Sequence, residues 1–209
     1  MSNRKTRVGI LLSGRGSNFV SLHAAMERGD VPAEIVLVLS NKQDAPGLGK
    51  ARERGIKALH LPYRRESLMD DEASMVRALK QHAVDWVCLA GFMRILSPRF
   101  VEAFHQRVLN IHPSLLPAFP GLAAQRQALE YGVKVAGCTV HLVDQGLDSG
   151  PIVHQEAVPV LDGDTEEDLS GRILVAEHRA YPLALQRLLR EQWTVVGRRV
   201  CFGIPDVDL

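Results

Sequence analysis

The chain has 209 residues, 46% hydrophobic and 23% charged, with a formal net charge of +1 at pH 7 and a pI near 7.8. This length and apolar content allow a full core, and we expect a single domain over residues 1–209. The near-neutral charge argues against nucleic-acid or membrane-surface partners, and no apolar stretch is long enough to span a bilayer.

Apolar runs bounded by turn residues alternate with helical periodicity through the first half of the chain. They predict strands over residues 7–12, 34–39, 56–61, 86–90 and 108–111, and helices over residues 17–28, 46–54, 66–82 and 98–104. Strand–helix–strand order favours parallel pairing, and nearly continuous apolar strands are typical of a sheet covered by helices on both faces. This half therefore predicts a doubly wound α/β pattern.

The second half of the chain changes character. It predicts helices over residues 122–131 and 165–190 and two long strands over residues 133–143 and 151–161. The link between the two strands, residues 144–150, is too short for a crossover helix, so we expect antiparallel pairing. The tail is ambiguous, and residues 194–202 are compatible with a small hairpin.

The cysteines are Cys88, Cys138 and Cys201, an odd count with no spacing typical of a metal site. We interpret them as reduced thiols in an intracellular protein, with the first two in buried strands. The apolar run at residues 8–12 is too short for a signal peptide, so the expected location is cytoplasmic.

Residues 110–117, Asn-Ile-His-Pro-Ser-Leu-Leu-Pro, place an amide beside an imidazole at the end of a predicted strand. The strand must end at Pro113, which cannot donate to a sheet ladder. Residues two apart in a strand share a face, so Asn110 and His112 are expected to face one pocket. An amide can donate to a developing oxyanion and an imidazole can move a proton, which suggests catalysis. The alternative is an incidental polar pair before a proline-rich turn.

A glycine-rich loop, Ser-Gly-Arg-Gly-Ser-Asn at residues 13–18, follows the first predicted strand and opens a helix. Backbone amides at a helix N-terminus favour an anion, so the loop predicts a phosphate site. The alternative is a tight turn in which Ser17 or Asn18 caps the helix. A dinucleotide site is disfavoured, because Phe19 replaces the third glycine of that fingerprint and Ser40-Asn41 stands where an acidic residue is expected.

Two further loops have the character of a ligand site. Residues 91–96 leave the carboxyl end of the fourth predicted strand, where open α/β sheets bind ligands, and their apolar side chains suit a flat heterocycle. We expect this loop, the glycine-rich loop and the Asn110 strand to line one crevice. The alternative for Phe92 and Ile95 is core packing.

The acidic loop at residues 144–148 offers a carboxylate that would hold the imidazolium of His112. The alternative is a solvated hairpin loop. Within the preceding long strand, His141 is expected to be a structural core histidine.

Several separated segments together resemble the phosphoribosylglycinamide formyltransferases, a folate-dependent family of purine synthesis. They are Gly-Arg-Gly-Ser-Asn at 14–18, Leu-Ala-Gly-Phe-Met-Arg-Ile-Leu at 89–96, Asn-Ile-His-Pro-Ser-Leu-Leu-Pro at 110–117, Leu-Asp-Ser-Gly-Pro-Ile at 147–152 and Glu-His-Arg-Ala-Tyr-Pro at 177–182. The resemblance runs from about residue 7 to 190. It implies a Rossmann-like formyltransferase fold: a mostly parallel sheet with an antiparallel C-terminal strand pair and helices on both faces.

The resemblance also implies the reaction, which is formyl transfer from 10-formyltetrahydrofolate to the amino group of 5'-phosphoribosylglycinamide. The implied catalytic residues are Asn110, His112 and Asp148. The ribonucleotide is expected to bind Gly16, Ser17, Asn18 and Glu177, and the folate Arg65, Met93, Arg94, Ile95, Leu96, Asn110 and Asp144.

The resemblance divides the chain into a ribonucleotide-binding half, residues 1–100, a folate and catalytic half, residues 101–190, and a tail, residues 191–209. The implied co-substrate is 10-formyltetrahydrofolate, without a metal. The expected partners are small-molecule substrates, and the protein is expected to be a monomer or a homodimer.

One departure from the family pattern lies near the expected site: Ala123 and Gln125 stand where histidines are usual. It keeps open a non-catalytic folate- or nucleotide-binding homologue. A formyltetrahydrofolate hydrolase and a methionyl-tRNA formyltransferase share the Ser-Leu-Leu-Pro segment. We expect each of those to carry an additional domain that 209 residues do not accommodate.

Overall fold

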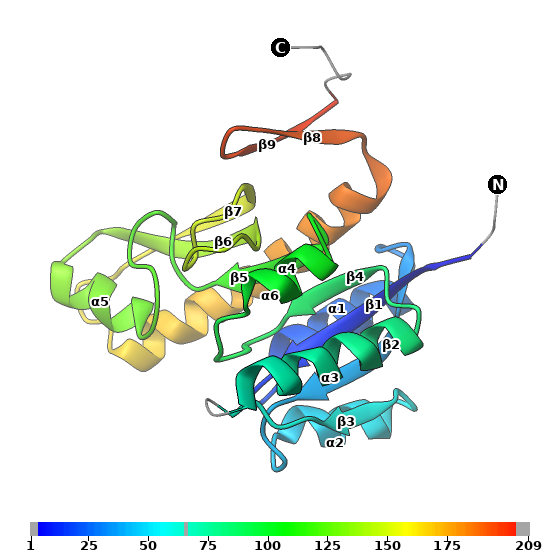
Figure 1. The fold of residues 1–209 in the computed structure, drawn as a ribbon. Coiled ribbons are helices and arrows are strands. Elements are labelled where there is room, and N and C mark those ends of the chain that lie inside the picture. The colour runs from blue at the N-terminus through cyan, green and yellow to red at the C-terminus, as the bar shows by residue number, and fades with distance from the viewer. Residues whose placement is uncertain (1–3, 65–66, 204–209) are drawn as a thin grey trace. The chain divides into compact units, whose positions relative to one another are not determined.

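A computed structural model describes residues 4–64 and 67–203 of the chain. The chain divides into two compact units, Met1–Leu109 and Asn110–Leu209, and the division falls within strand β5 (Val108–His112) (Figure 1). The expectation of one domain over residues 1–209 stays a prediction.

The first unit is built on parallel strands. They are β1 (Thr6–Leu12), β2 (Ala33–Ser40), β3 (Ala58–His60) and β4 (Trp86–Leu89), in the order β3-β2-β1-β4. β1 pairs with β2 and β4, and its residues from Val8 to Leu12 are buried. Burial on both faces explains why these strands have no polar alternation in the sequence.

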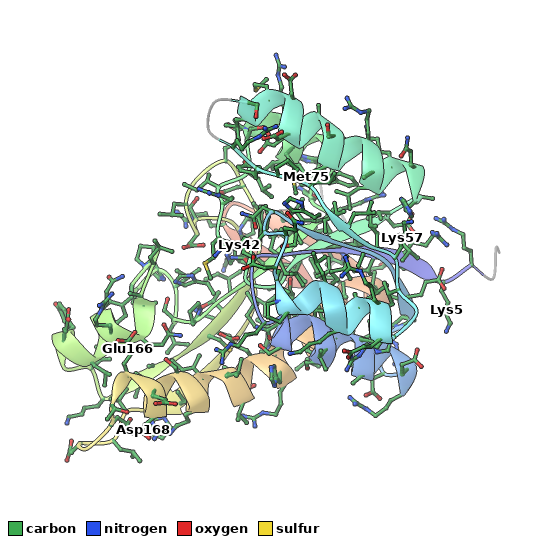
Figure 2. The ribbon with its side chains drawn as sticks, turned by 90° about the horizontal axis from the view of Figure 1, so that it is seen from below. Lys5, Lys42, Lys57, Met75, Glu166 and Asp168 are labelled. Carbon is green, nitrogen blue, oxygen red and sulfur yellow. The ribbon has the colours of Figure 1, made fainter. Side chains whose placement is uncertain are left out.

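The helices of this unit cover both faces of its strands. They are α1 (Ser17–Glu27), α2 (Pro46–Glu53), α3 (Leu68–Gln81) and α4 (Pro98–Ala103). Figure 2 shows α3 on one side of the strands and α1 and α2 on the other. Met75 is fully buried on α3. The predicted doubly wound pattern is confirmed.

The second unit holds the antiparallel part of the fold. Its further elements are α5 (Ala124–Tyr131), β6 (Val135–Leu142), β7 (Ile152–Pro159), α6 (Glu166–Arg190), β8 (Trp193–Val196) and β9 (Arg199–Phe202). Its strands follow the order β5-β6-β7-β9-β8, and β6 pairs antiparallel with β7 as the short link predicted. β8 and β9 form an antiparallel hairpin, which settles the ambiguous tail.

The long helix α6 packs against β6 and β7. It begins with a capping box, in which the Thr165 hydroxyl accepts from the Asp168 N–H and the Asp168 carboxylate accepts from the Thr165 N–H. Figure 2 labels Glu166 and Asp168 in this acidic first turn, where carboxylates stabilise the positive end of the helix dipole. The predicted fold class is confirmed.

Cys88, Cys138 and Cys201 carry thiols outside any disulfide, and the first two are buried, as predicted. Across residues 4–64 and 67–203, no helix has the length and apolar character needed to cross a membrane.

Two glycines test the packing of the second unit. A Cβ on Gly137 of β6 would lie 2.1 Å from the Glu156 carbonyl oxygen and 2.9 Å from Leu115 Cδ2. Gly137→Ala should therefore lower the free energy of unfolding by about 1–3 kcal/mol. Gly171, exposed on α6, has no heavy atom within 4 Å of such a Cβ, so Gly171→Ala should raise it by about 1 kcal/mol. Urea denaturation measures both, and equal effects would contradict the register of β6 and β7.

Candidate active site

Strand β5 brings an amide and an imidazole to its carboxyl end. His112 is the last residue of β5 and only 5% exposed, and Asn110 lies two residues before it and is half-buried. Pro113 follows, and the strand ends there as predicted. The turn that follows is fixed by Ser114, whose hydroxyl donates to the Ala118 carbonyl at 2.6 Å.

Both ring nitrogens of His112 face acceptors. Nε2 lies 2.9 Å from the Phe119 carbonyl oxygen, and Nδ1 lies 3.4 Å from Asp148 Oδ2. A carbonyl only accepts, so Nε2 carries a hydrogen. The Asp148 carboxylate lies beside the other ring nitrogen, so the ring is held between two oxygen acceptors.

The Asp148 carboxylate is almost buried, with a side chain 12% exposed. Its Oδ2 also accepts from the Gly121 N–H at 2.8 Å, so it connects its own loop with the loop that follows β5. Asp148 adopts a left-handed backbone conformation, with φ +48°. This conformation is uncommon outside glycine, although Asp and Asn tolerate it better than most residues.

Asp144 shapes the loop that carries Asp148. Its Oδ1 accepts from the Gly146 N–H at 3.0 Å and from the Ser149 hydroxyl at 2.7 Å. Gly150 is required for close approach, since a Cβ there would lie 1.8 Å from the Leu142 carbonyl oxygen. Of the two carboxylates offered by this loop, Asp148 is the one that faces His112.

His141 joins this cluster, although the sequence suggested only a structural role for it. It is 2% exposed, and its Nδ1 donates to the Leu142 carbonyl at 3.0 Å. Its Nε2 lies 3.1 Å from Asn110 Nδ2 and 3.8 Å from Asp148 Oδ1. Burial lowers the pKa of His141, against the opposing effects of the Leu142 carbonyl and Asp148. A neutral Nε2 accepts a hydrogen from the Asn110 amide and so fixes that amide's orientation.

The sequence did contain a signal for His141. It lies near the end of β6, directly before the acidic loop, and strand ends are where polar residues gather at α/β ligand sites.

The glycine-rich loop lies in the first unit. Gly16 is the N-cap of α1 in a left-handed conformation, φ +69°, and no side chain caps this helix. The alternative in which Ser17 or Asn18 is the N-cap is therefore wrong. Asn18 is 8% exposed and Ser17 is half-buried. The N-terminus of this 11-residue helix has no side-chain cap, and a helix N-terminus favours an anion.

Ser13 follows β1 and forms hydrogen bonds with the segments that follow β2 and β4. Its hydroxyl donates to Asn41 Oδ1 at 2.6 Å and accepts from the Met93 N–H at 2.9 Å, and its own N–H donates to the Gly91 carbonyl at 3.0 Å. The glycine-rich loop and the segment from Met93 are thus held together, as their positions at strand ends predicted.

The segment from Met93 to Leu96 is only partly an apolar wall. Met93 is 61% and Ile95 67% exposed, and Arg94 is exposed as well. Phe92 and Leu96 are buried at 9% and 6%. The core-packing alternative is therefore correct for Phe92 and wrong for Ile95.

The positions still to be described are Arg65, Glu177 and Ala123. Arg65 lies outside the described residues. Glu177 is 7% exposed on α6. Burial of Cys138 and, less strongly, the charge of Glu177 raise the pKa of the Cys138 thiol to about 12. Ala123, one of the departures from the family pattern, is the N-cap of α5 with φ +55°. That the glycine-rich loop, residues 91–96 and the Asn110 strand line one crevice stays a prediction, as does the contact of Glu177 with the ribonucleotide.

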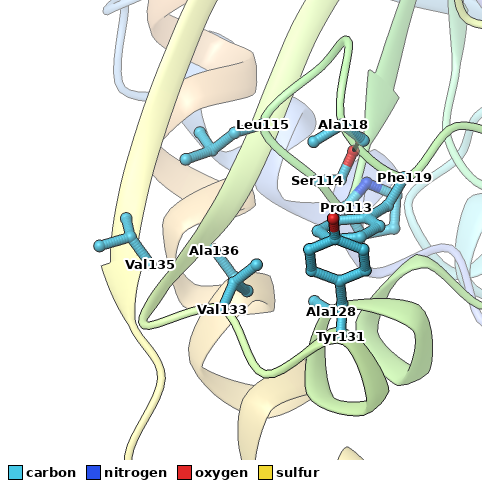
Figure 3. A pocket seen from close by; sticks show the side chains of 10 residues that line it. All are labelled: Pro113, Ser114, Leu115, Ala118, Phe119, Ala128, Tyr131, Val133, Val135 and Ala136. Carbon is cyan, nitrogen blue, oxygen red and sulfur yellow. Dashed lines mark hydrogen bonds between the residues drawn. The ribbon is translucent and has the colours of Figure 1, made fainter.

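An apolar cavity of about 390 Å³ adjoins the loop after β5 (Figure 3). It is lined by Pro113, Ser114, Leu115, Ala118, Phe119, Ala128, Tyr131, Val133, Val135 and Ala136. Phe119 and Tyr131 face one another there, with ring centroids 5.8 Å apart. Neither His112 nor Asp148 belongs to its lining. Among the described residues, no group of three or more His, Cys, Asp or Glu side chains is placed to hold a metal ion.

Comparison with known proteins identifies similar chains. The formyl transferase family model matches residues 6–185. The chain is 44% identical over 191 residues to phosphoribosylglycinamide formyltransferase of Escherichia coli, covering 90% of this chain and 87% of that one. It is 47% identical to part of the trifunctional purine biosynthetic protein adenosine-3 of Drosophila melanogaster, covering 90% of this chain but only 14% of that protein.

Solved structures with similar folds include proteins named for the same reaction. Glycinamide ribonucleotide transformylase 1 from Symbiobacterium toebii superimposes with a TM-score of 0.91 at 48% identity, over 97% of this chain and 95% of that one. A formyltetrahydrofolate deformylase from Pseudomonas syringae superimposes with a TM-score of 0.89 at 28% identity, over 95% of this chain and 66% of that one.

The lowered pKa of His141 predicts a pH dependence of stability. Below pH 6.5, the ordinary histidine value, the unfolded chain binds a proton at this residue more readily than the folded protein does. The stability that His141 contributes is therefore complete above pH 6.5 and is lost as the pH falls. NMR titration should find the His141 ring mostly neutral at pH 6.5, and His141→Gln should reduce the loss of stability between pH 7.5 and 5.5. A ring at least half protonated at pH 6.5 would contradict this.

Proposed function

The chain belongs to the formyl transferase family, and we propose that it transfers the formyl group of 10-formyltetrahydrofolate to the amino group of 5'-phosphoribosylglycinamide. The products are formylglycinamide ribonucleotide and tetrahydrofolate, in de novo purine biosynthesis. The observation that carries the proposal is the cluster of Asn110, His112 and Asp148 at the end of β5. Further support comes from the names of the relatives that this chain spans over most of their length.

The cluster suits an acyl transfer between two nitrogens. The acceptor amine attacks the formyl carbon, and negative charge collects on the carbonyl oxygen. Asn110 has two amide hydrogens, of which one is donated to His141, so the second is available to this oxyanion. One such donor is typically worth about 10²–10³ in kcat, or roughly 2.7–4 kcal/mol.

His112 supplies the second donor and the proton. Either ring nitrogen can donate to the oxyanion once it gives up its present contact. For Nε2 that contact is the Phe119 carbonyl, and for Nδ1 it is Asp148. Exchange at Nε2 keeps the contact between Nδ1 and Asp148, so the ring stays in place. As the intermediate collapses, the bond between the formyl carbon and the folate nitrogen breaks. The attacking amine loses a proton and the folate nitrogen gains one, which requires a group that both accepts and donates.

We also propose the remaining ligand contacts. Gly16, Ser17 and Asn18 would bind the phosphate of the ribonucleotide, and Glu177 its sugar. The folate would meet Met93 to Leu96, Asn110, Asp144 and Arg65. The enzyme would act in the cytoplasm on small-molecule substrates, as a monomer or homodimer and without a metal.

One experiment separates this reaction from its alternatives. The protein is incubated with 10-formyltetrahydrofolate, with and without the ribonucleotide, while folate absorbance and free formate are followed. Tetrahydrofolate formed only when the acceptor is present supports the transferase. Formate released without the acceptor indicates a hydrolase, the activity named for the Pseudomonas syringae neighbour. No reaction in either case indicates a non-catalytic homologue, to which Ala123 and Gln125 had pointed.

The phosphate loop gives a mutational prediction. A Cβ at Gly16 would lie 3.1 Å from Gly47 Cα, at a φ that favours glycine, so a side chain there would displace the loop proposed to bind the phosphate. Gly16→Val should raise the KM for the ribonucleotide by about tenfold or more and change the folate KM little. Gly29→Val is the matched control, since Gly29 has φ +80° beyond the other end of α1 and no neighbour within 4 Å. Equal changes in both KM values would remove the loop from the phosphate site.

A further inference from the structure

Glu72 on α3 is a buried carboxylate that the proposed reaction does not use. It is only 3% exposed. A buried carboxylate is costly unless hydrogen-bond donors replace its water. The donors here are the Tyr63 hydroxyl and the Ser97 N–H and hydroxyl.

Tyr63 links Glu72 to the backbone of residue 95. Its hydroxyl lies 2.5 Å from Glu72 Oε1 and 2.6 Å from the Ile95 carbonyl oxygen, so its hydrogen is shared between two acceptors. Burial, followed by the hydrogen bond and charge of Glu72, raises the pKa of Tyr63, which keeps that hydrogen on the phenol. The ring packs edge-on against Phe92, with centroids 5.8 Å apart.

Ser97 links Glu72 to the start of α4. Its N–H donates to Glu72 Oε1 at 2.7 Å, and its hydroxyl donates to Oε2. The same hydroxyl caps α4 by accepting from the Phe100 N–H at 3.3 Å. The carboxylate therefore fixes Ser97, the residue at which the next helix begins, and it holds the Tyr63 hydroxyl beside the Ile95 carbonyl.

These contacts hold a backbone whose side chains point to solvent. The segment is fixed at its front by Ser13, which accepts from the Met93 N–H, and at its back by Glu72. Between these points Met93 and Ile95 are 61% and 67% exposed. Apolar side chains presented on a fixed backbone lose less freedom when a ligand covers them, so such a surface binds more tightly than a mobile loop.

We propose that Glu72 is a positioning residue for folate binding: through Tyr63 and Ser97 it holds the segment from Met93 to Leu96 in its binding conformation. This inference rests on the proposed function, because the folate contact of that segment does. The competing explanation is that Glu72 only fastens α3 to α4. In that case its loss would reduce stability and leave the substrate affinities alone.

Steady-state kinetics distinguish the two. Glu72→Ala should raise the KM for 10-formyltetrahydrofolate by about tenfold, because the net contribution of about one hydrogen bond to binding is lost. The KM for the ribonucleotide should stay within about twofold of the parent value. Glu72→Gln should restore the folate KM, because an amide oxygen accepts from Tyr63 and the Ser97 N–H while its NH₂ donates to the Ser97 hydroxyl. Met75→Ala is the control for lost stability alone, since Met75 is fully buried on the same helix. It should leave both KM values unchanged.

Hydrogen exchange provides a readout that needs no turnover. The amides of residues 93–97 should exchange faster in Glu72→Ala than in the parent, and at the parental rate in Met75→Ala. If Glu72→Ala does not fold, Tyr63→Phe removes only the hydroxyl that reaches Ile95 and should raise the folate KM by a smaller factor.

The possible failures are separable. If the parent protein transfers no formyl group, the proposed function is wrong. Hydrogen exchange of residues 93–97 and folate binding measured by equilibrium dialysis then decide the role of Glu72. Equal rises in both KM values, an unchanged folate KM, or unchanged exchange at residues 93–97 in folded Glu72→Ala would each overturn the positioning role.

Discussion

The candidate active site depends on one buried charge. Asp148 lies in a loop after β6, and its carboxylate pairs with His112 at the end of β5 and accepts from the Gly121 N–H in the loop beyond it. The carboxylate side chain is only 12% exposed, and the His112 ring and a backbone donor lie against it. The loops on both sides of His112 are thereby fixed to one another, and the ring keeps one orientation.

Much of the fold follows from local rules. The parallel strands of the first unit could be predicted because a strand covered on both faces must be apolar throughout, and β1 is such a strand. The antiparallel pairing of β6 and β7 followed from a link too short for a crossover. Pro113 fixed the end of β5, and that boundary placed Asn110 and His112. The pairing of Asp148 with His112 was an expectation drawn from family resemblance, since an acidic loop alone also suits solvent.

The residues that were missed act through contacts between segments distant in sequence. His141 has the sequence surroundings of a core histidine, and only the approach of Asn110 gives it a polar partner on its second nitrogen. Glu72 follows Asp70 and Asp71, a run typical of a solvated helix face, yet it is 3% exposed because Tyr63 and Ser97 lie against it. The cap of α1 was assigned to Ser17 or Asn18 as an alternative, but Gly16 alone accommodates the left-handed turn. The place of His141 near the end of β6 was a local signal for it, whereas no local pattern reported the contacts of Glu72.

The central claim is that the Asp148 carboxylate holds the His112 ring in place for formyl transfer. Measurement of kcat for the parent and for Asp148→Asn tests it most directly. The amide removes the charge and retains the shape, so turnover should be greatly reduced in the folded variant. If kcat is the same in the two proteins, Asp148 does not act on His112, and the account of the site is wrong.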